Sequence, residues 1–96
     1  MTPDNNTEEF YKKLKVQLSD TSLWPAPYLY KFIVPTDISK IKEIETIFDH
    51  TGAVINRKES RTGKYTSVSV NVRMKNPDAV IAKYKEVGMV EGVISL

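Results

Sequence analysis

The run from residue 64 to residue 75 constrains the fold of this chain more than any other stretch, because its side chains alternate between apolar and polar. The apolar side chains are those of Val68, Val70, Val72 and Met74. The polar or charged side chains between them are those of Ser67, Ser69, Asn71 and Arg73. Alternate residues of an extended chain point to opposite sides. The run therefore predicts a strand with one buried face and one face open to solvent.

A run of aromatic and β-branched residues predicts a strand over residues 28–35, and two further strands are predicted over residues 53–60 and 89–96. Two helices are predicted between strands, because apolar residues recur there at helical spacing. The first covers residues 38–50 and is expected to stop before Gly52, a residue that suits a left-handed turn. The second opens with Asn76 as its cap and Pro77 in its first turn, and Gly88 closes it.

These elements follow one another in the order β-α-β-β-α-β. Both helices between strands have one apolar face, and so does the clearest strand. Placing both helices on one face of a four-stranded antiparallel sheet buries all of these faces together. The 96 residues of the chain are enough for one domain with a modest core. The predicted fold is therefore an α+β, ferredoxin-like split βαβ sandwich over residues 25–96.

Residues 1–24 are expected to form an extension that carries an additional amphipathic helix. This helix is predicted over residues 7–19, with Thr7 as its cap. Its apolar residues share one face: Phe10, Tyr11, Leu14 and Leu18. Such a face must be covered, and three places are open to it. They are an apolar patch of Leu29, Ile33 and Val54 on the second face of the sheet, the adjacent edge, and a second chain.

The composition narrows the classes of function. The chain has no cysteine, which rules out disulfides, thiolate metal sites and cysteine nucleophiles and fits a reducing compartment such as the cytoplasm. Basic and acidic residues number 14 and 12, a balance that does not by itself indicate nucleic acid or an anionic membrane as a partner. The polar N-terminus lacks the apolar core of a signal peptide, and no apolar run approaches the roughly 20 residues of a membrane helix.

The titratable residues show no arrangement typical of an enzyme. His50 is the only histidine, and it follows Asp49 at the end of the helix predicted over residues 38–50. The negative end of the helix dipole explains a histidine there without any catalytic partner. The carboxylates are scattered over separate elements, so no acid–base pair is indicated. We therefore expect a protein that is not an enzyme and that holds no cofactor or metal.

Residues 60–64 join two predicted strands, and the Gly-Lys pair within them raises the question of a phosphate site. A P-loop requires the pattern GxxxxGK[ST] at the start of a helix. Here Gly63 and Lys64 precede a strand, so their amides are expected to serve the sheet instead. Gly63 suits the positive φ of a tight hairpin, from whose tip Lys58, Arg61 and Lys64 are expected to project.

RNA binding through the open sheet face is an alternative, since RNA-recognition modules share this fold. The run Gly63-Lys64-Tyr65 begins like the basic-Gly-aromatic run of such modules. The residues that follow Tyr65 on its face cannot stack on a base: Ser67, Ser69 and Asn71. The aromatic residues of the first strand, Tyr30 and Phe32, are expected to face the helices. We therefore favour a structural role for this face over RNA binding.

Three stretches carry a family resemblance: PAPYLYK at residues 25–31, SRTGKYTSVS at 60–69, and YKEVG at 84–88 with the last strand. In these stretches the chain resembles the YbeD-like family, small bacterial proteins of unknown function. The resemblance implies a ferredoxin-like fold akin to ACT-type regulatory domains, which bind small effectors at interfaces between sheets. It brings no catalytic residue or ligand with it. Acylphosphatases share the fold, but their Gly-rich loop with a phosphate-binding Arg has no counterpart at residues 34–37.

The expected function is that of an ACT-like, non-enzymatic binding or regulatory module of the cytoplasm. Its partner is an unknown protein or a small-molecule effector, and a homodimer through an edge or through the N-terminal helix is one expectation. RNA binding and a role as a protein–protein adaptor are the alternatives. The residues of the expected binding surface are Lys31, Arg57, Lys58, Arg61, Lys64, Tyr65, Ser67, Ser69, Asn71 and Arg73. A plain solvated sheet face explains the same pattern.

Overall fold

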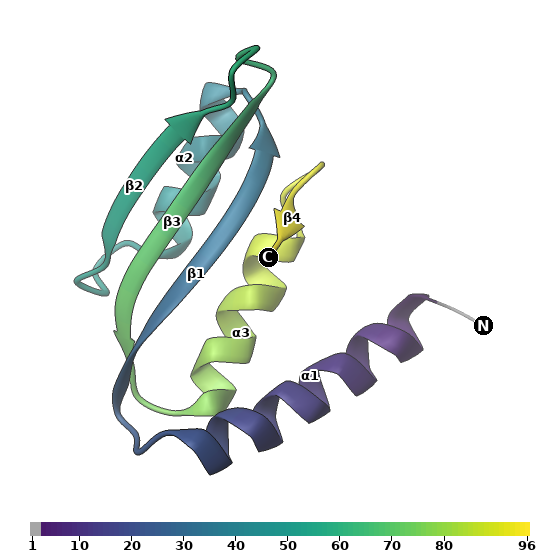
Figure 1. The fold of residues 1–96 in the computed structure, drawn as a ribbon, viewed down its shortest axis with the longest axis vertical. Coiled ribbons are helices and arrows are strands. Elements are labelled where there is room, and N and C mark those ends of the chain that lie inside the picture. The colour runs from purple at the N-terminus through teal and green to yellow at the C-terminus, as the bar shows by residue number, and fades with distance from the viewer. Residues whose placement is uncertain (1–2) are drawn as a thin grey trace.

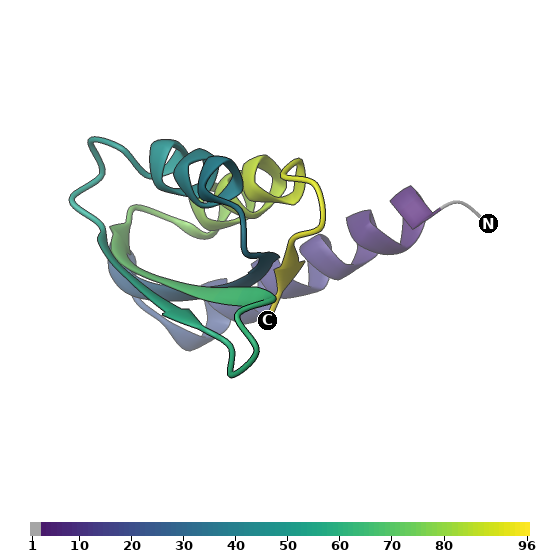
Figure 2. The ribbon, with the colours of Figure 1, turned by 90° about the horizontal axis from the view of Figure 1, so that it is seen from above.

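The computed structural model describes residues 3–96, with side chains from residue 8 onward. The helices and strands of this part are α1 (Pro3–Thr21), β1 (Ala26–Pro35), α2 (Ile38–Ile47), β2 (Val54–Glu59), β3 (Tyr65–Met74), α3 (Pro77–Gly88) and β4 (Ile94–Ser95). The strands form one antiparallel sheet in the order β2-β3-β1-β4, and α2 and α3 cover one of its faces (Figure 1, Figure 2). The predicted ferredoxin-like sandwich with an additional N-terminal helix is confirmed.

The strand β3 occupies the middle of the sheet, between β1 and β2. It pairs with β1 along its whole length, from Ala26 opposite Met74 to Pro35 opposite Tyr65. The apolar positions of β3 are buried and the positions between them are exposed or half-buried, as the alternation of its sequence predicts. The strand therefore divides the molecule into a covered side and an uncovered side.

Tyr30 of β1 lies at the centre of the core and is fully buried. Its ring centroid lies 5.7 Å from that of Phe32, 5.1 Å from that of Phe48 and 4.8 Å from that of Tyr84. Its hydroxyl donates to the carbonyl of Val80 at 2.9 Å. Burial of a large apolar side chain contributes about 1.5–3 kcal/mol, and a well-placed aromatic pair adds about 0.5–1.5 kcal/mol. Tyr30 thus joins the sheet to α3 and to the end of α2.

α2 ends at Ile47, earlier than the predicted end at residue 50. The next two amides bond to carbonyls three residues back, which tightens and closes the helix. His50 then has a positive φ of 62°, so the left-handed turn begins before Gly52. The ammonium of Lys83 on α3 donates to the carbonyl of Ile47 at 2.6 Å. Because this cap comes from another helix, the local sequence pattern did not reveal where α2 ends.

β4 (Ile94–Ser95) is much shorter than the strand predicted over residues 89–96. The chain forms turns after α3 instead, since the amides of Val90 and Val93 each bond to a carbonyl three residues back. Val90 is buried in the core, and Gly92 has a positive φ of 82°. The chain must therefore turn around Val90 before it can pair with β1.

α1 begins at Pro3, before the predicted start at Thr7, and runs along α3. Its connection to β1 is short, so it stays at the end of the molecule where β1 begins (Figure 1). It does not cover the predicted patch of Leu29, Ile33 and Val54. Leu29 and Val54 are 51% and 62% exposed. The open face, one of the three places left open for this helix, is therefore excluded, and the helix packs along α3 of its own chain.

Contacts from several side chains hold α1 against α3. The ring of Tyr11 lies 6.4 Å from that of Tyr84, and Lys15 forms an ion pair with Asp78 at 2.9 Å. The indole of Trp24 donates to the carbonyl of Leu18 at 3.0 Å, which fixes the end of the helix to the segment before β1. Exposed ion pairs contribute less than about 1 kcal/mol, so the half-buried apolar side chains provide most of the attraction.

Burial raises the pKa of the Tyr30 hydroxyl well above its ordinary range, and the neighbouring Tyr84 and Tyr28 add to the shift. Burial also raises the pKa of Tyr84, whose hydroxyl lies 2.8 Å from that of Tyr28. A group whose pKa is raised by folding stabilises the folded state below its unfolded pKa, which for tyrosine is about 10. That contribution is lost as the pH rises above this value.

We expect Tyr30→Phe to lower the free energy of unfolding by about 1–2 kcal/mol at pH 7, because the carbonyl of Val80 loses its buried donor. Above about pH 10, the free energy of unfolding of wild type should fall by about 1.4 kcal/mol per pH unit more than that of the variant. The reason is that only wild type must keep this buried phenol protonated. Urea unfolding of both proteins on either side of pH 10 measures the difference. A difference that does not change with pH would contradict this account of Tyr30.

Candidate functional site: the open face of the sheet

The open face is the side of the sheet opposite α2 and α3, and it is defined by the strand register. Its residues are Pro27, Leu29, Lys31, Ile33 and Pro35 of β1, Val54, Asn56 and Lys58 of β2, Tyr65, Ser67, Ser69, Asn71 and Arg73 of β3, Ile94 of β4, and Leu96 after it. Each of these side chains is exposed or half-buried. The positions between them on β1 and β3 are buried against the helices, apart from half-buried Ala26 and Tyr28.

Large apolar side chains lie exposed at the margins of the open face. Leu29 and Val54 belong to the same cross-strand row at one end of the sheet. Ile94 lies opposite Ile33 at the β4 edge, and Tyr65 lies at the start of β3. Asn71 lies between Leu29 and Val54, so these apolar side chains surround a polar centre and do not form one contiguous patch.

The charged groups of the open face are all positive: Lys31, Lys58 and Arg73. No ion pair joins any of them to a carboxylate within residues 8–96. The guanidinium of Arg73 donates instead to the carbonyl of Pro25, at 3.4 Å. Between the cations lie the small polar side chains of serine and asparagine. The open face is therefore positive, although the formal charge of the whole chain is only +2.

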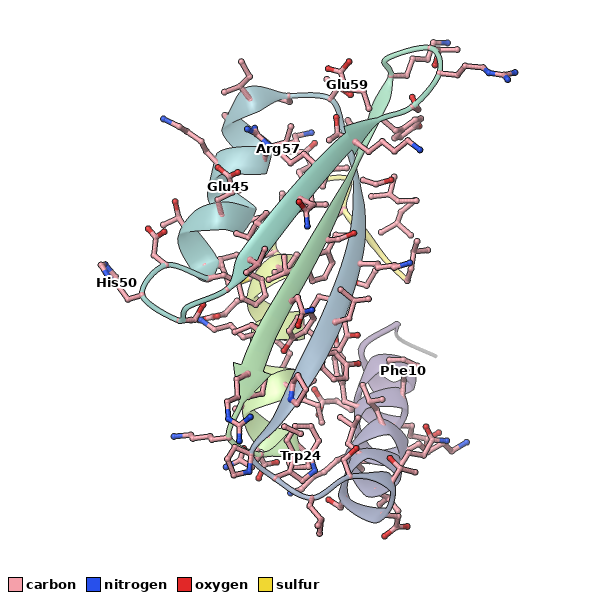
Figure 3. The ribbon with its side chains drawn as sticks, turned by 60° about the vertical axis from the view of Figure 1, so that its left-hand side comes forward. Phe10, Trp24, Glu45, His50, Arg57 and Glu59 are labelled. Atoms are coloured by element: carbon pink, nitrogen blue, oxygen red, sulfur yellow. The ribbon has the colours of Figure 1, made fainter. Side chains whose placement is uncertain are left out.

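The structure brings most of the predicted surface residues together on the open face: Lys31, Lys58, Tyr65, Ser67, Ser69, Asn71 and Arg73. Arg61 and Lys64 belong to the hairpin that borders it. Arg57 does not belong to this face, because it lies opposite Val68 and therefore points to the helix side. There its Nε lies 3.6 Å from the carboxylate of Glu45 on α2 (Figure 3). The prediction grouped Arg57 with the hairpin by nearness in sequence and overlooked the alternation of β2.

Sequence reasoning also missed part of the surface. Ile94 and Leu96 complete the apolar margin at the β4 edge, and Asn56 joins the polar centre. The alternation Ile94-Ser95-Leu96 was the available signal, since it places two apolar residues on one face of a strand. Apart from Tyr65, the predicted binding surface held only polar and basic residues. Leu29, Ile33 and Val54 were expected on this face only as a patch that the N-terminal helix could cover.

The hairpin between β2 and β3 has the predicted tight turn at Gly63, whose φ is 75°. The amide of Gly63 donates to the carbonyl of Ser60 at 2.9 Å, and the amide of Ser60 donates to the carbonyl of Tyr65 at 2.7 Å. The hydroxyl of Ser60 accepts from the amide of Tyr65 at 3.2 Å. These amides are used inside the hairpin, so the stretch makes a turn and not a cradle for phosphate.

The remaining candidates from the sequence lie apart from the open face. His50 is exposed in the turn after α2 and points away from the rest of the molecule (Figure 3). Within the described residues, no group of three or more histidine, aspartate or glutamate side chains is placed to hold a metal ion. Tyr30 and Phe32 face the helices and are fully buried, as predicted. Tyr65 is therefore the one aromatic side chain among the residues that define the open face.

The fold and surface define the class of protein: a ferredoxin-like α+β domain with an uncovered, positively charged sheet face. The family model described as "Protein of unknown function (DUF493)" matches residues 21–96, and the chain belongs to this family. The match agrees with the resemblance to YbeD-like proteins of unknown function. No curated protein and no solved structure matches the chain significantly. Among the described helices, none has both the length and the apolar character needed to cross a bilayer.

Substitution of Gly63 tests the backbone geometry of the hairpin turn. We expect Gly63→Ala to lower the free energy of unfolding by about 1–2 kcal/mol, because an L-residue is strained at positive φ. Contact with other parts of the molecule does not contribute, since no atom beyond the adjacent residues lies within 4 Å of an added Cβ. The control is Gly88→Ala, which has equally open surroundings but helical backbone and should stabilise by up to about 1 kcal/mol. Chemical denaturation that gave both variants the same sign would contradict the turn geometry.

Proposed function

We propose that this protein is a non-enzymatic binding module of the cytoplasm whose open sheet face docks an acidic region of a partner protein. The observation that carries the proposal is that the open face combines exposed apolar side chains with cations that have no carboxylate partner within residues 8–96. Lys31, Lys58 and Arg73 supply the positive charge, and Leu29, Val54 and Ile94 supply the apolar area. No carboxylate belongs to this set, so a partner with acidic groups is favoured over a second copy of the same face.

The two kinds of group would make different contributions. Covering the apolar margin removes it from water at roughly 25 cal/mol per Å² of apolar surface, which supplies affinity. The cations attract an acidic surface from a distance and fix its orientation, which supplies on-rate and specificity. The serine and asparagine side chains of the centre can form hydrogen bonds with the partner. A surface that combines apolar and polar parts is typical of transient protein interfaces.

A protein partner is better supported than RNA. Single-stranded nucleic acid is held largely by stacking of bases on aromatic rings, which contributes roughly 1–3 kcal/mol per base. The open face offers only Tyr65 for stacking, at its end beside the hairpin. The exposed aliphatic side chains have no use in such a site, whereas they are ordinary components of a protein interface. The likeness to effector-binding ACT domains is a likeness of fold and identifies no ligand.

The proposal predicts that the immobilised protein no longer retains a specific set of acidic proteins when the charge of its open face is reversed. Immobilised wild type, Lys31→Glu/Arg73→Glu and Lys12→Glu/Lys13→Glu are exposed to native cell extract, with and without nuclease. Retained proteins are quantified by mass spectrometry. The control pair makes the same charge change on the exposed side of α1. The face variant should lose the acidic proteins about tenfold or more, whereas wild type and the α1 control retain them and 0.5 M salt releases them.

Two outcomes would overturn the proposal. The same proteins on all three resins would show that the open face is not the docking surface. Proteins that disappear with nuclease would point to RNA as the primary ligand. Thermal unfolding of each variant is measured beforehand, and substitutions at exposed sites are expected to change stability by no more than about 0.5 kcal/mol.

A further inference from the structure

The edge strand β2 has an uncovered side that is complementary to itself. β2 is the outermost strand in the order β2-β3-β1-β4, so in the described chain no other strand pairs with its outer side (Figure 1). We infer that this edge pairs in antiparallel fashion with the same edge of a second copy of the chain. The inference does not depend on the acidic partner proposed above, because it concerns a different surface.

The hydrogen bonding of the hairpin determines which backbone groups are free. The amide of Ser60 donates to the carbonyl of Tyr65, so residues 60 and 65 form a hydrogen-bonded pair. Such pairs recur at every second residue of an antiparallel ladder. Residues 54, 56 and 58 of β2 therefore use their backbone groups toward β3. The N–H and C=O groups of Ile55, Arg57 and Glu59 point away from the sheet.

These outward groups can all be satisfied in one two-fold symmetric register. When Arg57 lies opposite Arg57 of the second copy, Ile55 of each chain lies opposite Glu59 of the other. In this register every outward residue of one strand meets an outward residue of its partner, and each pair exchanges two hydrogen bonds. Shifting the register by two residues in either direction leaves the outward N–H and C=O groups of either Ile55 or Glu59 without a partner in β2 of the second copy. The two-fold register centred on Arg57 is therefore favoured.

Charged side chains normally keep edge strands from pairing, and this register sets Arg57 opposite Arg57, but each arginine also has carboxylates as neighbours. The side chains of Arg57 and Glu59 both lie on the helix side, and Arg57 is already within 3.6 Å of Glu45 (Figure 3). Across the two-fold axis, each Arg57 has Glu59 of the other chain as its diagonal neighbour, a position that long side chains can reach. The two opposed guanidinium groups are thus surrounded by carboxylates from both chains.

Pairing through β2 would also enlarge the open face. Both sheets would form one continuous sheet with the helices of both chains on the same side. Asn56 and Lys58 lie on the open face, where Lys58 of one chain would be opposite Asn56 of the other. No lysine would lie directly opposite a lysine, although the two Lys58 side chains would be diagonal neighbours on this face. A single acidic partner could contact both copies.

The register predicts which engineered cysteine cross-links the chain to a second copy. The protein has no cysteine of its own, so a single one can be introduced cleanly. Arg57→Cys places two thiols opposite each other, with Cα atoms about 5.5 Å apart, which a disulfide can span. Ile55→Cys is the control on the same face of the same strand, since the two thiols would be about 13 Å apart along the strands. Under mild oxidation, Arg57→Cys should form a disulfide-linked dimer at least about tenfold faster than Ile55→Cys. Equal rates would overturn the register.

Measurements without cysteine test the pairing itself. In wild-type protein, hydrogen exchange of the amides of residues 55, 57 and 59 should slow as the protein concentration rises, whereas the amides of 54, 56 and 58 are protected at every concentration. Glu59→Lys should weaken dimerisation in sedimentation experiments about tenfold relative to Glu91→Lys, which makes the same charge change in the loop before β4. A wild-type chain that sediments as a monomer up to millimolar concentration would overturn the inference.

Discussion

The pairing of β1 with β3 along their full length is the constraint on which the rest of the structure depends. It sets Tyr30 and Phe32 beside Val70 and Val68 and so makes one continuous apolar slab. Because side chains alternate strictly along a strand, a shift of one residue would send this slab into solvent. Both inter-strand helices must lie on the slab, and the opposite face of the sheet is left uncovered.

The uncovered face and the helix layer differ in how their charges are arranged. The helix side carries both signs of charge and includes ion pairs, such as Arg57 of β2 with Glu45 and Lys83 with Glu86. Cations of the open face have no carboxylate partner within residues 8–96. A nearly neutral chain therefore presents one electrically balanced side and one positive side. Net charge alone conceals this division, since it sums over both sides.

Local chemistry was sufficient to predict much of the fold. The alternation of residues 65–74 determined which side of the sheet is buried, and the side chain of Asn76 accepts from the amide of Ala79 at 2.8 Å, as its predicted role as a cap requires. Features that depend on distant partners were predicted less well. Lys83 closes α2 from another helix, and Val90 shortens β4 because it is held in the core. The location of α1 depends on contacts with α3 that no pattern within residues 7–19 contains.

The candidate surface was predicted correctly where the alternation of side chains along a strand was used to assign residues to a face. Ser67, Ser69 and Asn71 were placed correctly because their strand alternates visibly. Arg57 was misplaced because β2 has a weaker alternation and lies beside a basic hairpin, where nearness in sequence is misleading. The apolar margin at Ile94 depends on a strand of two residues, and its pairing with Ile33 becomes visible only in the folded chain.

The division of β2 into two sets of residues restricts how this chain can change during evolution. Residues 54, 56 and 58 bond to β3 through their backbone groups and have their side chains on the open face. Residues 55, 57 and 59 have outward backbone groups, and their side chains lie on the side of α2. Inserting or deleting a single residue within Val54–Glu59 would exchange the two sets from that point on, bringing Lys58 toward the helices and Arg57 to the open face. Length changes should therefore accumulate in the hairpin at residues 60–64, where an added residue leaves both sets in place.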